Sequence, residues 1–250
     1  MFMRSEGDEK KLEFTLATSK ARWTTQTIIS AKDNQAPSFP HISTSFPVLD
    51  IALGIGGLPR GRISELIGIP TSGMATLALK TIVNAQQNGG TAVYLDLAHT
   101  FDPDYAHRCG INLSQLLLIH PYNSQQALAM LPDFALNGDL DIFVFDMALA
   151  NPIATLDQTL GRLIAPLSKT RCALLFLTSL PTLSSATHTA VLSHFAVVRL
   201  LIHKSRWLYK LGDVAGYEAE VQLLKNKFGI PGQVVNIAIT FNGTVQGDGT

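Results

Sequence analysis

The stretch at residues 62–90 reads RISELIGIPTSGMATLALKTIVNAQQNGG and has the clearest pattern in the chain. Its first part, residues 63–67, is a short apolar run with β-branched ends, which is typical of a buried strand. Residues 68–73 mix glycine, proline, threonine and serine, and this mixture predicts a tight loop. Apolar residues return at helical spacing over residues 76–87, and the pair Gly89-Gly90 ends that helix. The stretch therefore predicts a strand, a loop and a helix in succession.

Gly68 and Gly73 enclose four residues between the predicted strand and helix, which is the spacing of a phosphate-binding loop. In such a loop, backbone N–H groups and the helix N-terminus surround the phosphate oxygens. The full pattern continues with lysine and then serine or threonine, whereas this chain continues with Met74 and Ala75. The sequence therefore predicts the backbone of a nucleotide site without the two side chains that hold phosphate charge and Mg²⁺.

Composition indicates a globular chain with no general attraction for nucleic acid. Hydrophobic residues make up 46% and charged residues 15% of the 250 residues, and Lys+Arg and Asp+Glu balance at 19 each. Because the chain is neutral, nucleic-acid binding requires a local basic patch. The low charge fits a protein that hides surface in an assembly as well as it fits a compact monomer.

Neither the cysteines nor the histidines indicate a metal site. Cys109 and Cys172 lack metal-ligand spacing and form no disulfide framework, and the seven histidines are scattered. No apolar run reaches about 18 residues, and the N-terminus lacks the apolar core of a signal peptide. We therefore expect no metal, no membrane contact and a cytoplasmic location.

The pattern divides the chain into an N-terminal segment with its linker, residues 1–40, and a core, residues 41–250. The segment around Trp23 is interpreted either as an oligomer contact or as a lid on the same domain. In the core, strands are expected at residues 91–97, 116–119, 141–145 and 172–178. Helices are expected from Asp102, over 125–136 with Ser124 as its cap and Pro132 as a possible break, and over 157–167. This alternation predicts a mostly parallel sheet with helices on both faces.

After Ser179 the pattern changes to four strand-like runs at short spacing, residues 194–203, 204–211, 217–227 and 233–241. Residues 212–216 (GDVAG) are a turn signal between two of these runs. Together they predict an antiparallel extension at one edge of the sheet.

Several ordered motifs resemble the ATPase core of the RecA family. They are ISTSFPVLDIALGIGGLPRGRISELIGIPTSGMATL at 42–77, YLDLAHTFDPDYAHRCGI at 94–111, DIFVFDMALA at 141–150, HFAVVRLLIH at 194–203 and LLKNKFGIPGQ at 223–233. The resemblance covers about residues 42–245. It implies an α/β fold, namely a RecA-like P-loop NTPase core, and we expect no RecA C-terminal domain.

The resemblance implies a weak or vestigial nucleotide site at Gly68, Thr71, Ser72, Gly73, Met74, Ala75, Asp102, Tyr105 and Asp146. In the family, Lys225 and Lys227 correspond to lysines that reach the nucleotide of the neighbouring subunit. Asp146 corresponds to the Walker B carboxylate, and a strand-end residue that caps a turn is the alternative. For the two lysines, an edge-strand charge pair is the alternative.

The departures from the family pattern concern catalysis. The glutamate that polarises the attacking water falls on Ala98, and the glutamine that couples nucleotide state to DNA binding falls on Ser179. Because phosphoryl transfer depends on charge neutralisation and a positioned water, we expect no catalytic residue. ATP with Mg²⁺ is expected to bind weakly at most. If the chain is an enzyme after all, the family implies a DNA-dependent ATPase.

The family's two DNA loops are also reduced: the first is largely deleted at residues 147–163, and the second, residues 180–193, contains no Lys or Arg. Arg162 and Arg206 are the remaining DNA-binding candidates. Arg199, Lys204, Arg206 and Lys210 would split between the two faces of a strand, and Trp207 with Tyr209 would offer either base stacking or cross-strand packing.

The function expected from these departures is that of a catalytically degenerate RecA-like accessory or regulatory factor, similar to the ImuA and SulA type. Its partner would be a RecA filament or a DNA-repair polymerase assembly, with possible self-association and single-stranded DNA binding. The alternative is an active, ATP-dependent, single-stranded-DNA-binding recombinase. A third hypothesis is a self-assembling structural module.

Overall fold

The computed structural model describes residue 15 and residues 39–147, 155–179, 186–241 and 245–249. The chain divides into two units, residues 1–38 and 39–250, and every element named below belongs to the second. No helix in this described part of the chain is long and apolar enough to cross a membrane.

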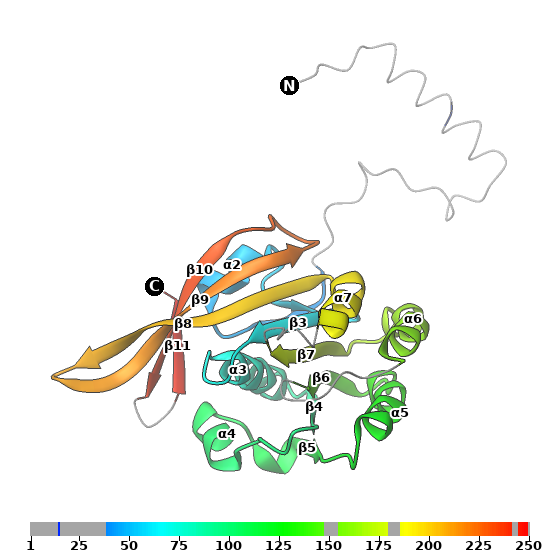
Figure 1. Ribbon diagram of the computed structural model, residues 1–250, viewed down its shortest axis with the longest axis horizontal. Helices are drawn as coiled ribbons and strands as arrows, with labels where there is room; N and C mark the ends of the chain where they lie inside the picture. Colours follow the sequence, from blue (N-terminus) through cyan, green and yellow to red (C-terminus); the bar gives the residue numbers. More distant parts are fainter. Residues whose placement is uncertain (1–14, 16–38, 148–154, 180–185, 242–244, 250) are drawn as a thin grey trace. The chain divides into compact units, whose positions relative to one another are not determined.

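A nine-stranded sheet forms the centre of the second unit (Figure 1). Its strands are β3 (Ile63–Gly68), β4 (Thr91–Asp96), β5 (Leu116–Ile119), β6 (Leu140–Asp146), β7 (Ala173–Ser179), β8 (Val198–Lys210), β9 (Asp213–Asn226), β10 (Val234–Phe241) and β11 (Val245–Gly249). The order across the sheet is β11-β10-β9-β8-β3-β7-β6-β4-β5. Pairing is parallel from β8 to β5 and antiparallel from β8 to β11. The predicted α/β class with an antiparallel edge extension is confirmed.

Helices cover both faces of this sheet (Figure 1). They are α2 (Pro47–Leu53), α3 (Met74–Gln87), α4 (Pro103–Cys109), α5 (Ser124–Ala135), α6 (Leu156–Leu167) and α7 (Ala186–Phe195), with a 3-10 turn η1 (Leu113–Gln115). A second, two-stranded sheet joins β1 (His41–Ile42) to β2 (Leu58–Pro59).

The alternation of side chains along the central strands creates two separate hydrophobic cores. In β6, Ile142 and Val144 pack with α2, α3 and α4, whereas Phe143 and Phe145 pack with α5, α6 and α7. This division follows from the two-residue repeat of a strand that is buried on both faces. Both cysteines are buried.

Several predicted boundaries are wrong by a residue or more. α3 begins at Met74, two residues before the expected start. The side chain that caps α5 is that of Asn123, which accepts a hydrogen bond from the Gln126 N–H (2.8 Å), rather than Ser124. Pro132 does not break this helix. It lies inside α5, which continues to Ala135 with its apolar face buried.

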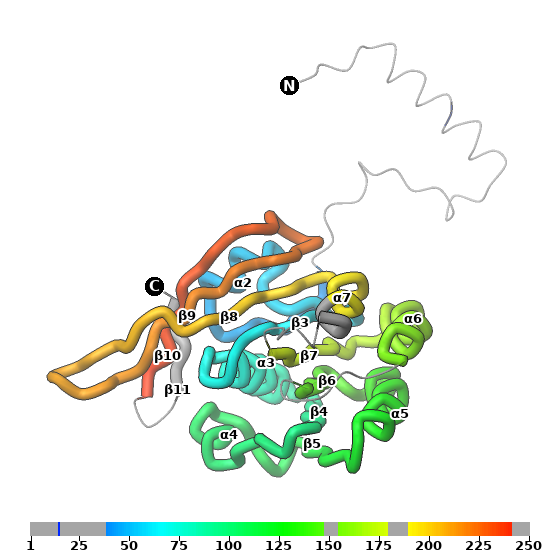
Figure 2. The backbone as a smooth tube through the Cα atoms, viewed as in Figure 1, coloured from blue at the N-terminus to red at the C-terminus, as the bar shows by residue number. Residues whose placement is uncertain are grey.

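The runs at residues 194–203 and 204–211 were expected to be two strands, but they form the end of α7 and one long strand, β8. β8 and β9 continue together well beyond the parallel part of the sheet (Figure 2). The turn between them is Leu211-Gly212, one residue earlier than the expected start at residue 212. Both residues have positive φ, +52° and +92°, which is the sign pattern of a type I′ hairpin turn.

Candidate functional site

The loop between β3 and α3 has the backbone of a phosphate-binding loop. Thr71 has a φ of +69° and Gly73 one of +102°. A Cβ at Gly73 would lie 3.0 Å from Ile239 Cδ1 and 3.2 Å from the Tyr217 hydroxyl. Glycine is favoured here for two reasons: the φ is left-handed, and side chains of β9 and β10 pack closely against this position. α3 then begins without a side-chain cap.

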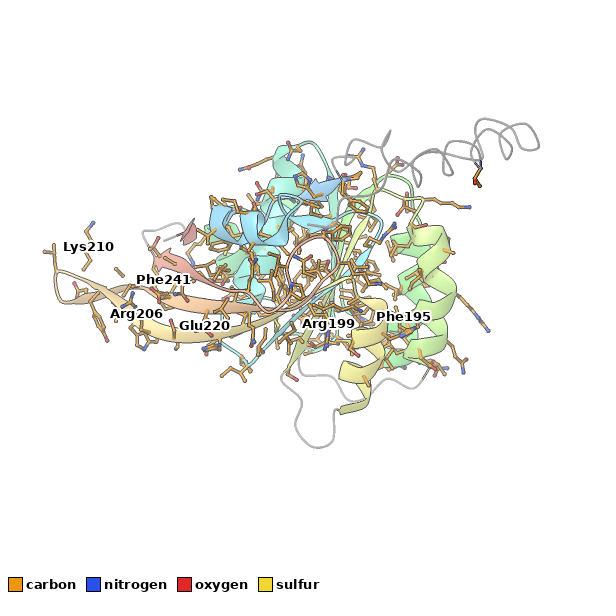
Figure 3. The ribbon with its side chains drawn as sticks, turned by 90° about the horizontal axis from the view of Figure 1, so that it is seen from above. Phe195, Arg199, Arg206, Lys210, Glu220 and Phe241 are labelled. Carbon is orange, nitrogen blue, oxygen red and sulfur yellow. The ribbon has the colours of Figure 1, made fainter. Side chains whose placement is uncertain are left out.

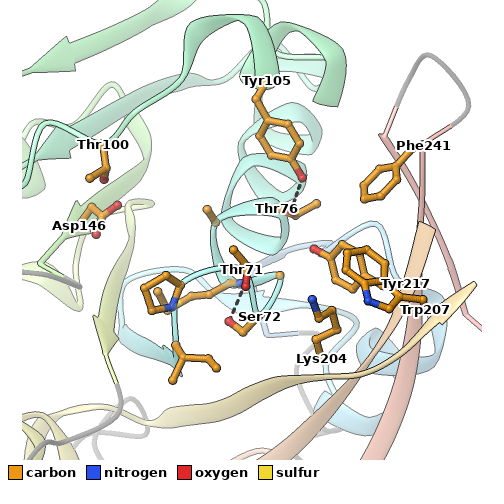
Figure 4. A pocket seen from close by; sticks show the side chains of 15 residues that line it. Thr71, Ser72, Thr76, Thr100, Tyr105, Asp146, Lys204, Trp207, Tyr217 and Phe241 are labelled. Atoms are coloured by element: carbon orange, nitrogen blue, oxygen red, sulfur yellow. Dashed lines mark hydrogen bonds between the residues drawn. The ribbon is translucent and has the colours of Figure 1, made fainter. Parts of the chain in front are cut away.

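A cavity of about 460 Å³ lies against this loop (Figure 4). The loop and the first turn of α3 form one wall, including Thr71, Ser72, Gly73, Met74 and Ala75. The other walls come from distant parts of the chain: Thr100, Tyr105, Asp146, Lys204, Trp207, Tyr217 and Phe241. The predicted residues Thr71 to Ala75 are therefore gathered around one cavity, together with residues of four strands and α4, whereas Gly68 ends β3 and does not line it.

Met74 and Ala75 leave this wall without charge. Met74 is only 7% exposed and belongs to the hydrophobic core, and its thioether occupies the position where phosphate loops carry lysine. Ala75 is exposed but has no hydroxyl. Lys80, six residues beyond Met74 along α3, donates to the Cys109 carbonyl (2.9 Å) and is not a replacement.

Asp146, at the end of β6, lines the cavity and is buried. The Tyr94 hydroxyl donates to its Oδ2 at 2.6 Å. Burial, together with the Asp146 charge, raises the pKa of Tyr94 well above its ordinary value. Tyr94 therefore stays a neutral donor that holds the Asp146 carboxylate at the edge of the cavity.

Of the predicted site residues Asp102 and Tyr105, Tyr105 lines the cavity. Its hydroxyl shares a hydrogen bond of 2.5 Å with Thr76 Oγ1, and burial raises its pKa. Asp102 instead caps α4: its Oδ1 accepts a hydrogen bond from the Tyr105 N–H (3.0 Å). Asp102 thus acts on the site through the position of Tyr105.

Lys225 and Lys227 lie near the end of β9. Lys225 Nζ donates to the carbonyls of Ser193 (2.7 Å) and His194 (3.3 Å), which belong to the last turn of α7. Burial lowers the pKa of Lys225, and the charges of Lys227 and Arg199 lower it further. Lys227 is exposed. The predicted contact with a neighbouring subunit stays a prediction.

The basic residues considered for DNA do not form one surface. Arg206 is paired with Glu218 (Nη2 to Oε2, 2.7 Å), and Arg199 is paired with the buried Glu65 (2.5 Å). Figure 3 shows Arg199 at the body of the sheet, with Arg206 and Lys210 out along the hairpin. Arg162 is exposed on α6, away from that hairpin. DNA binding by Arg162 and Arg206 remains a prediction.

Lys204 also lines the cavity, although it was not among the predicted nucleotide-site residues. Its Nζ lies 3.9 Å from the centre of the Trp207 ring, and both side chains line the cavity. The only signal in the sequence was the cluster of basic and aromatic residues along this run. The pairing irregularity after Lys204, which turns Trp207 to the same face, depends on β9 and is invisible in the sequence of β8 alone.

The described residues contain no group of three or more His, Cys, Asp or Glu side chains that could hold a metal ion. A phosphate-bound Mg²⁺ would meet Asp146 but no loop hydroxyl at position 75. The residues present fit a nucleotide without its metal better than a nucleotide with it.

Comparisons with known proteins identify the family of this chain. The family model of the RecA N-terminal domain matches residues 10–165, so the match begins inside the predicted N-terminal segment. Protein RecA of Delftia acidovorans is 30% identical over 266 residues, which cover 96% of this chain and 72% of that protein. Protein RecA of Paenarthrobacter aurescens is 30% identical, covering 96% and 77%. Protein RecA of Agrobacterium fabrum is 33% identical over 233 residues, covering 83% and 64%. The chain therefore belongs to the RecA family.

Proposed function

We propose that this protein binds a nucleoside phosphate without hydrolysing it and acts as an accessory or regulatory factor in DNA damage response, recombination or translesion synthesis. The observation that carries the proposal is that Met74 and Ala75 directly follow the loop and line its cavity, with Met74 buried against the core. A site that keeps its backbone and cavity but loses its charge can bind a ligand without turning it over.

The magnitudes favour binding over turnover. A charged hydrogen bond to phosphate contributes roughly 1.5–3 kcal/mol. The loop lysine, the Mg²⁺-binding hydroxyl and the water-polarising glutamate are all absent, at Met74, Ala75 and Ala98. Together these absences remove several kcal/mol from the transition state of phosphoryl transfer. Ligand binding loses less, because the backbone amides, the apolar walls and Tyr105 are unaffected.

The proposed partner is a RecA filament or a DNA-repair polymerase assembly, and self-association is included in the proposal. This chain belongs to the RecA family. Lys227 is exposed, and by the resemblance it corresponds to a lysine that reaches the neighbouring subunit in that family. The balanced charge gives no support for DNA as the main partner. A cytoplasmic location is part of the same proposal.

Two measurements on the purified protein test this function. Calorimetry with ADP and ATP should show binding, while phosphate release, with or without single-stranded DNA, should stay at background. Co-sedimentation with RecA filaments should bring the protein into the pellet, and Lys227→Glu should reduce the amount bound. A protein that binds no nucleotide, RecA or repair polymerase rules the proposal out.

The alternative is an active recombinase, and the specific observation in its favour is the 30% identity to RecA proteins along 96% of the chain. It predicts salt-sensitive binding of single-stranded DNA and DNA-dependent ATP turnover that Asp146→Asn abolishes. Turnover with these properties would replace the proposed accessory role.

A further inference from the structure

We propose that Lys204 binds the ligand phosphate in this cavity, in place of the lysine that the loop lacks, and that the ligand is a nucleoside diphosphate bound without Mg²⁺. The inference rests on the proposed function, because it names the ligand and the cation of the same site. It places the positive charge on β8, outside the loop.

β8 runs directly beside the phosphate loop. Its residue Ile202 pairs with Gly68, the last residue of β3 and the first of the loop. Because a strand advances about 3.3 Å per residue, Lys204 lies just past the end of β3 and next to the loop. Figure 4 shows its amine directed into the cavity that Ser72 also lines.

An irregular pairing between β8 and β9 turns Lys204 and Trp207 to the same face. Lys204 pairs with Ala219 and Trp207 pairs with Tyr217, so Ser205 is an extra residue on β8. In a regular strand, residues three apart point to opposite faces, whereas a bulge shifts the alternation by one. Both side chains consequently enter the cavity, with the Lys204 ammonium over the Trp207 ring at 3.9 Å.

The Lys204 ammonium can leave the Trp207 ring and bind a phosphate instead. Within the described residues, no carboxylate lies within ion-pair distance of Lys204. A contact between an ammonium and an aromatic face is weaker than a charged hydrogen bond to phosphate. A bound phosphate therefore takes the ammonium and leaves the face of Trp207 to the ligand.

The aromatic walls of the cavity suit a planar base. Trp207 and Tyr217 meet edge to face at 6.0 Å, and Tyr217 and Phe241 meet at 5.7 Å. Trp207 is 45% exposed and Phe241 is 42% exposed, so both rings offer surface for stacking once the Lys204 ammonium has moved from Trp207 to the phosphate. Stacking on aromatic side chains tolerates any base, so the structure assigns a nucleoside and not one particular base.

The charges of the cavity favour a diphosphate over a triphosphate. Among the described lining residues, Lys204 and Asp146 are the charged ones, and they carry opposite charges. A triphosphate adds a further negative charge that neither a loop lysine nor Mg²⁺ offsets here. The absence of a hydroxyl at Ala75 removes the loop's ligand for that metal.

Calorimetry with ADP, ATP and adenosine on the full chain tests the inference, in EDTA and in Mg²⁺. Lys204→Ala should weaken ADP binding by about tenfold or more, the loss expected when one charged hydrogen bond is removed. Lys204→Arg should keep most of the affinity. Lys210→Ala is the matched control, because Lys210 is an exposed lysine of the same strand, and it should change nothing. Adenosine, which has no phosphate, should bind wild type and Lys204→Ala equally.

The outcomes separate the two proposals. If wild type binds ADP and Lys204→Ala binds it equally well, or if binding needs Mg²⁺, this inference is overturned while the proposed nucleotide binding stands. If ATP binds clearly tighter than ADP in EDTA, the assignment of a diphosphate is wrong. If wild type binds neither nucleotide at millimolar concentration, the proposed nucleotide binding fails and this inference fails with it.

Discussion

The Arg199 guanidinium on β8 lies 2.5 Å from the Glu65 carboxylate on β3, in the middle of the sheet. The Glu65 side chain is fully buried, and the Thr178 hydroxyl donates to its other oxygen at 2.9 Å. Glu65 thus bonds to the two strands on either side of β3. Because β3 leads into the phosphate loop, the Glu65–Arg199 pair helps to fix the position of that loop.

Removing one member of this pair should cost far more stability than removing both. Arg199→Met leaves the Glu65 charge buried without its cation, which typically costs about 3–5 kcal/mol. The double variant Glu65→Leu with Arg199→Met should lose less than Arg199→Met alone, because no buried charge remains. Urea unfolding of the single and double variants measures both.

The control for this cycle is the pair His203 and Glu220 on β8 and β9, whose side chains are both more than a third exposed. His203→Gln should change the free energy of unfolding by about 1 kcal/mol or less, because solvent screens a contact between exposed side chains. Strictly additive losses at Glu65 and Arg199 would contradict the proposed coupling.

Glu65 also predicts how stability depends on pH. Burial raises its pKa above the ordinary value, although Arg199 and Thr178 act in the opposite direction. With a raised pKa in the folded state, the protonated carboxyl favours folding. Its contribution is full below the unfolded pKa of about 4.3 and is lost as the pH rises through the folded pKa.

Glu65→Gln imitates the protonated form, so the stability of this variant relative to wild type should increase as the pH rises from about 4 to 8. Urea titrations across that range give the difference directly. A difference that shrinks with rising pH would show that the folded pKa is lowered.

Restoring the two missing loop side chains should restore metal-dependent binding but not catalysis. Met74→Lys with Ala75→Thr supplies a phosphate cation and a Mg²⁺ ligand, so ATP affinity should rise by about tenfold or more and become Mg²⁺-dependent. Turnover should stay at background, because Ala98 provides no carboxylate to polarise water. Calorimetry and phosphate release measure the two effects.

Met74→Leu is the control for this change, because it keeps the buried apolar volume and should leave ATP affinity unaltered. An unchanged ATP affinity in the restored loop would mean that its backbone does not present these side chains to a phosphate.

The tip of the β8–β9 hairpin offers a stabilising substitution. Leu211 is 98% exposed and has a φ of +52°, which costs a leucine roughly 1–2 kcal/mol. Leu211→Asn creates Asn-Gly, the preferred pair for a type I′ turn, and should raise the free energy of unfolding by about 0.5–1 kcal/mol. Thermal and urea unfolding check this prediction. Val214→Asn, a substitution of an exposed strand residue beside the turn, should give no such gain.

The strand, loop and helix at the phosphate site were readable directly from residues 63–87, and so were the parallel strands that follow. These patterns are local. A strand that is buried on both faces needs a continuous apolar run, and a helix that is buried on one face needs apolar residues at the helical repeat. The replacements at Met74, Ala75 and Ala98 were equally readable, because a motif position depends only on order along the chain. The α/β class and the family follow from such local information.

The partners around the cavity were not readable in this way. Lys204, Trp207, Tyr217 and Phe241 come from three strands that meet the loop only when β8 pairs with both β3 and β9. The extra residue at Ser205 reverses the alternation along β8 beyond Lys204, so a strict two-residue repeat would place Trp207 on the face opposite Lys204. Side-chain direction after a bulge is set by the neighbouring strand, so it was the folded sheet that brought Trp207 to the face of Lys204 and placed both beside the loop.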